Sequence, residues 1–190
     1  MNWILASGSP RRRELLEMLG VPDLTIRPAT GPERATPGAG PEQTVRELSL
    51  HKAQEVAQTC APEDIIIAAD TIVYLDGAIL GKPKDHDDAV RMLTALSGRE
   101  HIVYTGVAVL RGGELRQAAE HTAVRFRTLM PAEIERYIAT GEPMDKAGAY
   151  GIQGRGALFV AHLDGDYFNV MGLPLCRLGQ LLNELGVELL

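Results

Sequence analysis

Blocks of helical and strand-like hydrophobic spacing alternate along the chain. Apolar residues three and four positions apart mark one buried face of a helix. This spacing predicts five helices, over residues 11–19, 44–58, 89–96, 131–140 and 174–185. Continuous runs of β-branched and apolar residues predict buried strands. We place these strands over residues 4–6, 64–75, 101–110, 124–126 and 158–160.

This order of elements predicts an α/β fold. Helices alternate with strands, which is typical of a sheet with helices packed on it, although Gly112-Gly113 predicts a hairpin between two successive strands. We therefore expect a mixed, mostly parallel sheet with packed helices, within one domain that spans residues 1–190. A loop rich in proline, glycine and threonine runs from Pro28 to Pro41. Long loops in compact domains are often functional.

Composition limits the kinds of partner. The 190-residue chain is 45% hydrophobic and carries a formal net charge of −6, which disfavours binding to nucleic acid or to an anionic membrane by bulk charge. An aromatic content of 5% also argues against stacking on bases. No apolar stretch is long enough to span a bilayer, and the apolar start precedes the first arginines, the reverse of the order in a signal peptide. We expect a cytoplasmic protein with no nucleic-acid or membrane partner.

The start of the first predicted helix breaks a local rule. Arg11, Arg12 and Arg13 stand in the turn where the helix dipole is already positive. The conflict disappears if an anion binds there, held by backbone N–H groups, by the guanidinium groups and by the hydroxyls of Ser7 and Ser9. The alternative is a solvated basic turn. Because three arginines follow a Ser-x-Ser-Pro segment directly after a strand, we favour a phosphate site.

Lys52 and Asp70 break the hydrophobic pattern of their own segments. At about 100° per residue, Lys52 falls in the middle of the apolar stripe of its helix. It either extends along the helix surface to solvent or faces a polar ligand. Asp70 lies within the apolar run Ile65–Val73, where aspartate is rare. It either binds a turn at the end of the strand or is a buried carboxylate with a ligand. Because the apolar run continues beyond Asp70, we expect it to be the catalytic residue.

Weaker candidates lie in turns and loops. Lys82, between a glycine and a proline, is either surface charge or a phosphate contact. The glycine-rich loop at residues 148–156 lets backbone approach a ligand closely, and Gln153 within it offers an amide donor and acceptor to a base edge. Lys146 directly precedes this loop. Glu33, in the long loop, is either a metal ligand or a surface residue.

Several short motifs follow one another along the chain. They are Leu5-Ala6-Ser7-Gly8-Ser9-Pro10-Arg11-Arg12, Lys52-Ala53, Ala68-Ala69-Asp70-Thr71-Ile72-Val73, Gly81-Lys82-Pro83, Leu96-Ser97-Gly98, the segment from Glu142 to Gly154, and Gly172-Leu173-Pro174-Leu175. In this order they resemble the motifs of the Maf family of nucleoside triphosphate pyrophosphatases. The resemblance runs nearly from end to end.

The resemblance implies an elongated, two-lobed Maf/ITPase-like fold with a central cleft, and a homodimer. It implies hydrolysis of a nucleoside triphosphate between its α- and β-phosphates, with a divalent cation, Mg²⁺ or Mn²⁺. Asp70 matches the general base of the family. Lys52, Lys82 and Glu33 match its polar catalytic cluster, in which Asp70 and Glu33 would hold the metal. Family members often carry more acidic residues before this glutamate than the Thr30-Gly31-Pro32 segment found here.

The family divides by substrate. One branch prefers dTTP and UTP and another prefers 7-methyl-GTP, and Arg11, Thr71 and Gln153 match the first. We therefore predict a housekeeping dTTP/UTP pyrophosphatase. Its expected substrate-binding residues are Ser7, Ser9, Arg11, Arg12, Arg13, Thr71, Lys146 and Gln153. The alternatives are the same chemistry on another nucleotide, such as 7-methyl-GTP, and a nucleotide-binding regulator of septum formation with little catalysis.

Overall fold

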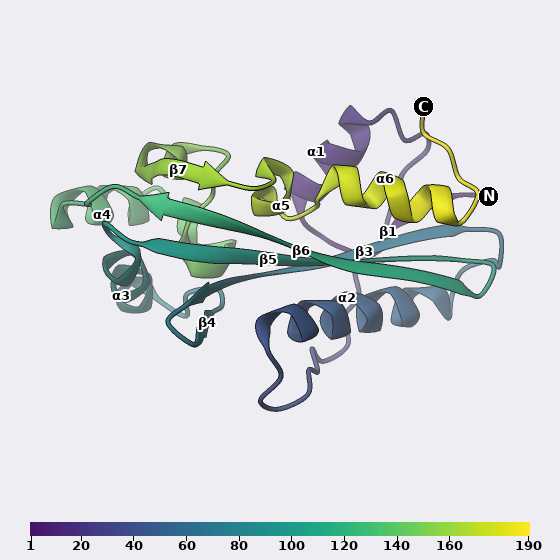
Figure 1. Ribbon diagram of the computed structural model, residues 1–190, viewed down its shortest axis with the longest axis horizontal. Coiled ribbons are helices and arrows are strands. Elements are labelled where there is room, and N and C mark those ends of the chain that lie inside the picture. The colour runs from purple at the N-terminus through teal and green to yellow at the C-terminus, as the bar shows by residue number, and fades with distance from the viewer. The chain divides into compact units, whose positions relative to one another are not determined.

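A computed structural model describes residues 1–190 as an α/β protein (Figure 1). Its strands are β1 (Trp3–Leu5), β2 (Thr25–Ile26), β3 (Ile65–Leu75), β4 (Ala78–Leu80), β5 (Glu100–Arg111), β6 (Glu114–Phe126) and β7 (Val160–Asp164). Its α-helices are α1 (Pro10–Met18), α2 (Pro41–Ala57), α3 (His86–Leu96), α4 (Pro131–Ile138), α5 (Tyr167–Met171) and α6 (Leu175–Glu184). Three 3-10 helices complete it, η1 (Glu142–Asp145), η2 (Ala147–Ala149) and η3 (Arg155–Phe159).

The strands form one sheet in the order β2-β1-β3-β5-β6-β7, with β4 paired to β3. Crossovers through α1 and α2 bring β1, β2 and β3 together in parallel, and Ile4 of β1 lies opposite Ile66 of β3. Two-residue turns join β3 to β4 and β5 to β6, whereas a long connection over residues 127–159 joins β6 to β7. β3 with β4 and β6 with β7 pair antiparallel. The hairpin predicted at Gly112-Gly113 is confirmed as the short turn between β5 and β6.

The sheet is mixed but mostly antiparallel, so the prediction of a mostly parallel sheet was wrong. Parallel pairing needs a crossover of a dozen or more residues, and a two-residue turn allows only antiparallel pairing.

The five predicted helices are confirmed, with ends shifted by a few residues. The strand expected over residues 158–160 was placed too early, because Arg155–Phe159 form η3 and the strand β7 begins at Val160. The elements β2, β4 and α5 were not predicted, since each is too short to leave a periodic pattern. None of the helices combines the length and apolar character that a bilayer crossing requires.

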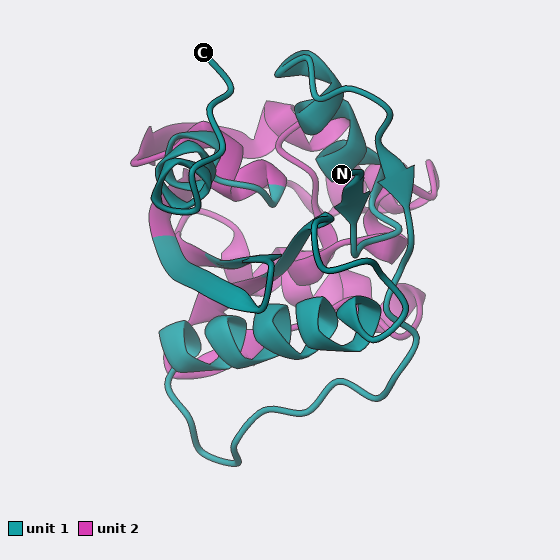
Figure 2. Ribbon diagram, turned by 90° about the vertical axis from the view of Figure 1, so that its right-hand side faces the viewer, with its two compact units in different colours: residues 1–70, 105–120, 172–190 teal, residues 71–104, 121–171 magenta.

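The chain divides into two compact units (Figure 2). Unit 1 contains residues 1–70, 105–120 and 172–190, and unit 2 contains residues 71–104 and 121–171. Strand β3 therefore passes from unit 1 to unit 2 between Asp70 and Thr71. The expectations of one domain, an elongated shape and a cleft between two lobes stay predictions.

In unit 1, helix α2 covers one face of the sheet, and α1 and α6 lie on the other (Figures 1 and 2). Ala53 and Val56 of α2 pack against apolar side chains of β1 and β3. Gly106 of β5 brings the helix close, because a Cβ atom there would lie 2.1 Å from the carbonyl oxygen of Val45. The backbone of α2 therefore packs directly on a strand.

In unit 2, aromatic side chains form the centre of the core. Phe126 lies between His101, Tyr150 and Phe159, with ring centroids 5.0, 4.7 and 5.9 Å away. His101 is 2% exposed, and its Nε2 lies 2.8 Å from the hydroxyl of Tyr150. Burial lowers the pKa of His101 to about 4, because the charged imidazolium loses its hydration.

Replacing Gly106 by alanine should destabilise the protein by about 3 kcal/mol, the upper end of the usual cost of overpacking, because the new methyl group overlaps helix backbone that cannot rotate away. The measurement is the free energy of unfolding in denaturant. Gly179→Ala is the matched control, since nothing lies within 4 Å of a Cβ atom at that position of α6. There alanine should leave stability unchanged or raise it by about 0.5–1 kcal/mol.

Stability should fall in acid through His101. Its folded-state pKa of about 4 lies below the ordinary 6.5, so the unfolded chain binds the proton first. The contribution of neutral His101 to the free energy of unfolding is fully present above pH 6.5 and is lost as the pH falls from 6.5 to about 4. Below pH 4 no more is lost, and the total loss is about 3 kcal/mol. Unfolding curves of wild type and His101→Asn across this range should converge at low pH. The exposed His162→Asn control should keep the full acid-induced loss.

Candidate active site

Lys52 brings two carboxylates together in unit 1. Its ammonium nitrogen lies 2.5 Å from Oδ1 of Asp70 and 2.8 Å from Oε1 of Glu33. The side chains of Asp70 and Lys52 are only 11% and 19% exposed, whereas that of Glu33 is 64% exposed. Lys52 therefore meets carboxylates instead of extending to solvent. Asp70 lies within β3 and accepts from a helix lysine, so the alternative of a strand-end turn was wrong.

The sequence of α2 explains how Lys52 reaches Asp70. Val45, Ser49, Ala53 and Val56 are all buried and form the face that packs on the sheet. Ser49 and Ala53 are small, so the helix can lie close to the strands. Lys52 is next to Ala53 in the helix, and its side chain is long enough to reach Asp70 on β3.

Glutamates of α2 hold the loop that carries Glu33. Oε1 of Glu55 accepts the backbone N–H of Thr30 at 2.7 Å and that of Gly31 at 3.1 Å. Glu47 accepts the backbone N–H of Thr36 at 2.6 Å and its hydroxyl at 3.0 Å. The backbone N–H groups of Thr30 and Gly31 lower the pKa of Glu55, since they stabilise the ionised carboxylate. The loop is thus attached to the helix on both sides of Glu33.

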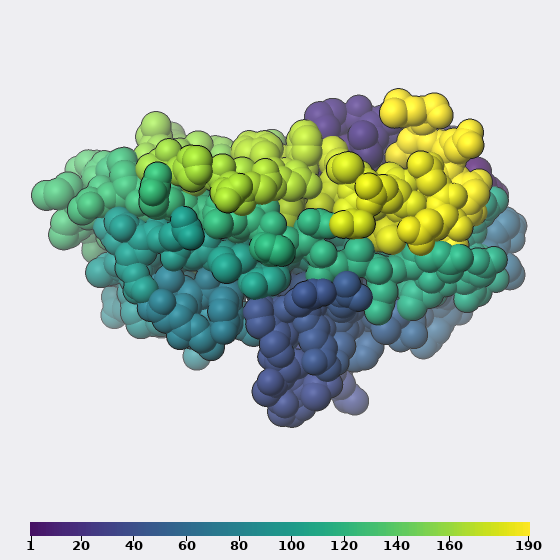
Figure 3. Space-filling model, viewed as in Figure 1, coloured from purple at the N-terminus to yellow at the C-terminus, as the bar shows by residue number.

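Gly31 leaves room for this attachment, because a Cβ atom there would lie 2.6 Å from Oε2 of Glu55 and would displace the carboxylate. Figure 3 shows the segment that leads into α2, in dark blue, at the surface of the molecule. The residues from Thr30 to Arg34 are exposed. Hydrogen bonds from its backbone to Glu55 and Glu47, and not apolar packing, therefore hold this loop.

Arg12 is the most enclosed of the three predicted arginines. Its Nε donates to the carbonyl of Gly172 at 2.8 Å, and its Nη1 donates to the hydroxyl of Ser7 at 3.0 Å. Burial lowers the pKa of Arg12, and the nearby charges of Asp70 and Glu33 oppose that effect. Arg12, Asp70 and Glu33 therefore share one electrostatic neighbourhood.

The other residues at the start of α1 differ in placement. Ser9 is the N-cap, but its side chain makes no cap hydrogen bond, and its N–H donates to the hydroxyl of Ser7 at 3.3 Å. Arg11 is half-buried and adds its charge beside Arg12. Arg13 pairs with Glu17 at 2.6 Å, with its side chain 60% exposed.

Asp70 and Glu33 have the donor chemistry that a divalent cation prefers. Mg²⁺ and Mn²⁺ bind hard oxygen ligands, and Mg²⁺ is commonly held by one or two carboxylates together with substrate phosphates and waters. No group of three or more histidine, cysteine, aspartate or glutamate residues is arranged to hold a metal ion. The two carboxylates that meet Lys52 therefore fit a cation whose remaining ligands come from a phosphate and from water.

Unit 2 contains the other predicted residues. Thr71 is half-buried in β3, and Lys82 is exposed just after β4. Next to Lys82, the carbonyl of Gly81 accepts the N–H of Gly148 at 3.0 Å. This bond ties the lysine turn to the glycine-rich segment. Gln153 is exposed within that segment.

Lys146 is engaged within its own segment. Its ammonium donates to the carbonyl of Glu142 and to Oδ1 of Asp145, each at 2.6 Å, and its side chain is 12% exposed. It closes the 3-10 helix η1, and its role in substrate binding stays a prediction.

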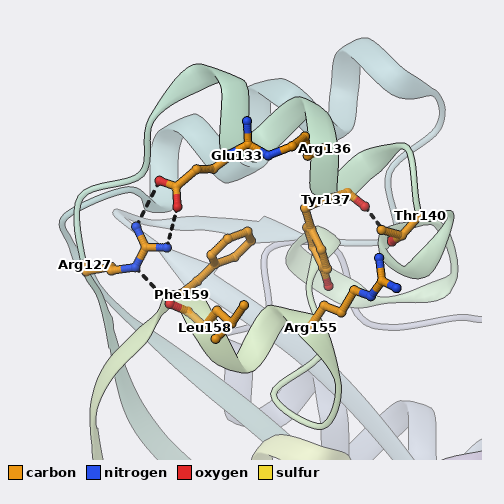
Figure 4. Close-up of a pocket in the computed structure, with 8 residues that line it drawn as sticks. All are labelled: Arg127, Glu133, Arg136, Tyr137, Thr140, Arg155, Leu158 and Phe159. Carbon is orange, nitrogen blue, oxygen red and sulfur yellow. Dashed lines mark hydrogen bonds and ion pairs between the residues drawn. The ribbon is translucent and has the colours of Figure 1, made fainter.

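A pocket in unit 2 lies between α4 and η3 (Figure 4). Arg127 bonds Glu133 at its left end, and Tyr137 and Phe159 form its wall. Its lining residues are Arg127, Glu133, Arg136, Tyr137, Thr140, Arg155, Leu158 and Phe159. None of them was predicted as a site residue. Tyr137 and the backbone of Arg155 also contact Glu142, which accepts hydrogen bonds from both.

Sequence reasoning missed the glutamates that hold loops, namely Glu47, Glu55 and Glu142. In the sequence, each looks like a glutamate that faces solvent, which is the usual place for this residue. For two of them, a glycine in the loop was the available signal. Gly31 lies beside Glu55 and Gly154 lies beside Glu142, and a side chain at either glycine would collide with the carboxylate.

The fold and the site together define a class of protein. It is an α/β protein in which half-buried cations stand beside carboxylates that fit a metal, the combination that phosphoryl-transfer sites use. The chain belongs to the Maf family, because residues 2–185 match the family model described as Maf-like protein.

Relatives cover almost the whole chain. A "dTTP/UTP pyrophosphatase" of Moorella thermoacetica is 52% identical over 97% of this chain and 95% of its own. A second protein with this name, from Symbiobacterium thermophilum, is 51% identical over 96% of this chain and 93% of its own. A solved structure, the Ham1 protein of Staphylococcus aureus, overlaps 66% of this chain and 72% of its own at 13% identity, with a TM-score of 0.48. That overlap is too slight to bear on function.

Replacing Glu55 by glutamine should loosen the loop that carries Glu33. The carboxamide keeps one acceptor but loses the charge, so amide hydrogen exchange at Thr30 and Gly31 should accelerate roughly ten- to a hundredfold. Glu42→Gln, on the same helix and outside this attachment, is the control and should leave both rates unchanged. Equal acceleration in the two variants would show that Glu55 does not hold the loop.

Proposed function

We propose that this protein hydrolyses dTTP and UTP to the monophosphate and pyrophosphate. The observation that carries the proposal is the Lys52 ammonium between Asp70 and Glu33, with half-buried Arg12 in the same electrostatic neighbourhood. The relatives support it, since proteins about half identical over nearly the full chain bear the name dTTP/UTP pyrophosphatase. Arg11, Thr71 and Gln153 support the pyrimidine preference, because they match that branch of the family.

The cations bind the triphosphate. A triphosphate repels an attacking hydroxide, and guanidinium and ammonium groups offset that charge. Arg11 and Arg12 at the start of α1, together with the backbone N–H groups that Ser9 does not cap, receive phosphate oxygens. Lys52 and Lys82 add ammonium groups, and Ser7 holds the guanidinium of Arg12 in place. Arg13, later in α1, and Lys146, just after η1, complete the proposed set of cations that bind the triphosphate.

Asp70 acts on the water. Phosphate oxygens offer the Lys52 ammonium new acceptors, which leaves an oxygen of Asp70 available to accept a proton from water. The water oxygen forms a bond to the α-phosphorus, and the bond from that phosphorus to the bridging oxygen breaks. Pyrophosphate leaves with the electron pair. Lys52 offsets the negative charge that develops at the oxygens.

Asp70 and Glu33 are the residues that would hold Mg²⁺ or Mn²⁺. Such an ion, when bound, neutralises phosphate charge and lowers the pKa of a coordinated water. Glu33 is the more exposed of the two carboxylates. Its loop attachment by Glu47 and Glu55 sets where its oxygen ligand stands.

Thr71 and Gln153 select the base. An amide side chain presents a donor and an acceptor together, which complements a ring carbonyl beside a ring N–H. A base with the opposite pattern leaves both groups unpaired, and that costs binding. We further propose a central cleft for the substrate, a homodimer and a cytoplasmic location, in keeping with the resemblance to the family.

Asp70→Asn should lower the turnover number by about 10²–10⁴ without unfolding the protein, because the amide cannot accept the proton. Pyrophosphate release from dTTP measures turnover, and thermal unfolding checks the fold. Asp76→Asn is the matched control, since Asp76 is exposed in the turn after β3 at φ 49, which asparagine tolerates. Near-normal turnover of Asp70→Asn would remove Asp70 from the proposed role.

A panel of dTTP, UTP, CTP and 7-methyl-GTP, each with Mg²⁺ or Mn²⁺, tests the substrate. We expect the first two to give the highest kcat/KM and to release pyrophosphate. Preference for 7-methyl-GTP would move the enzyme to the other branch of the family. Tight triphosphate binding without turnover would instead favour a regulator.

A further inference from the structure

Two side chains outside the predicted site hold both ends of the loop that presents Gln153. Oε1 of Glu142 accepts the hydroxyl of Tyr137 at 2.9 Å and the N–H of Gly156 at 3.2 Å. Its Oε2 accepts the N–H of Arg155 at 3.1 Å. The hydroxyl oxygen of Tyr137 in turn accepts the N–H of Gly151 at 3.1 Å. We call Tyr137 and Glu142 the loop anchor.

The loop anchor closes the loop between residues 151 and 156. A Cβ atom on Gly156 would lie 2.4 Å from the carbonyl oxygen of Gly151 and 2.8 Å from the hydroxyl of Tyr137. One on Gly154 would lie 2.9 Å from Oε1 of Glu142, and its φ of 123° is open only to glycine. The two ends of the loop therefore touch each other and the anchor, and Gln153 lies between them.

The anchor itself is rigid. The ring of Tyr137 packs edge-on against Phe159 at 4.9 Å, and Figure 4 shows it between α4 and η3. Burial raises the pKa of Tyr137 well above its ordinary value, so its hydroxyl remains a donor. Burial alone would raise the pKa of Glu142, yet the N–H groups of Arg155 and Gly156 lower it, so its carboxylate remains an acceptor. Each bond of the anchor thus keeps its direction across the neutral range.

The neighbour of Gln153 points the other way. Ile152 is 8% exposed, whereas Gln153 is exposed. An amide can discriminate between bases only if its donor and acceptor are held in place, because a mobile amide satisfies either pattern. A loop with both ends fixed and Ile152 buried supplies that restraint.

We propose that Tyr137 and Glu142 are positioning residues for base selection, which hold the loop so that Gln153 presents a fixed amide to the pyrimidine. This inference rests on the proposed function. It assigns the anchor no contact with the substrate and no part in the attack on the α-phosphorus. Its loss should therefore change selectivity much more than turnover.

The test is Tyr137→Phe, which removes one hydroxyl and leaves the ring against Phe159. The ratio of kcat/KM for dTTP to that for CTP should fall roughly tenfold, through a higher KM for dTTP, with kcat within about twofold of wild type. Amide hydrogen exchange at Gly151, Arg155 and Gly156 should accelerate. Glu142→Gln, which keeps one acceptor oxygen but turns a donor toward the loop, should behave alike and serves if Tyr137→Phe fails to fold.

Tyr150→Phe is the matched control. It removes a hydroxyl from the same aromatic core, but that hydroxyl bonds His101 and not the loop backbone. Its selectivity ratio should stay at the wild-type value even if its stability falls. In a Gln153→Ala background, Tyr137→Phe should change selectivity no further, because the amide that the anchor positions is already absent.

An unchanged ratio in folded Tyr137→Phe, or an equal loss in Tyr150→Phe, overturns the inference. So does an additive effect in the Gln153→Ala background. Failure of the proposed function is a separate result, since it shows in wild type as no pyrophosphate release from dTTP. In that event, exchange rates at Gly151, Arg155 and Gly156 still decide whether the anchor holds the loop.

Discussion

The ammonium of Lys52 joins parts of the chain that the sequence keeps far apart. It contacts a loop through Glu33 and the sheet through Asp70, while its own helix covers the sheet. Two carboxylates this close together would repel each other without a cation between them. In the function that we propose, the same electrostatic demand lets these carboxylates accept a divalent cation, and the cation in turn attracts a polyphosphate. The attached loop, half-buried Arg12 and the packing of α2 all help to fix the positions of these charges.

A common device positions both loops. In each, a glutamate accepts two backbone N–H groups, and a glycine leaves room for its carboxylate, Gly31 for Glu55 and Gly154 for Glu142. Hydrogen bonds to an ionised acceptor are stronger than those between neutral groups. A loop held in this way needs little apolar surface. Such a loop can stay exposed to solvent and still have its backbone attached to the rest of the protein.

The sequence predicted those parts of the fold that follow from local spacing. The apolar stripes defined α2 and α4, and the interruptions of those patterns by Lys52 and Asp70 marked the residues that the structure brings together. Sheet direction was mispredicted because helices and strands alternate at first, whereas short turns such as Gly112-Gly113 join later strands, and β7 pairs antiparallel with β6 across a long connection that leaves no local signal. The loop-holding glutamates were not predicted, since in the sequence a glutamate that binds a distant backbone resembles one that faces water. Only the glycines beside two of them, Gly31 and Gly154, offered a signal.

The absence of a side chain at Gly106 limits which substitutions the protein can accept near Lys52 and Asp70. Val45, whose carbonyl lies against it, is seven residues, or about two helical turns, from Lys52. The missing side chain on β5 therefore sets how closely the helix approaches the sheet, and with it the reach of the ammonium to Asp70. A larger residue at position 106 would be tolerated only if α2 moved away from the strand. A change at this position is thereby coupled to the contact between Lys52 and Asp70, on which the proposed catalysis depends.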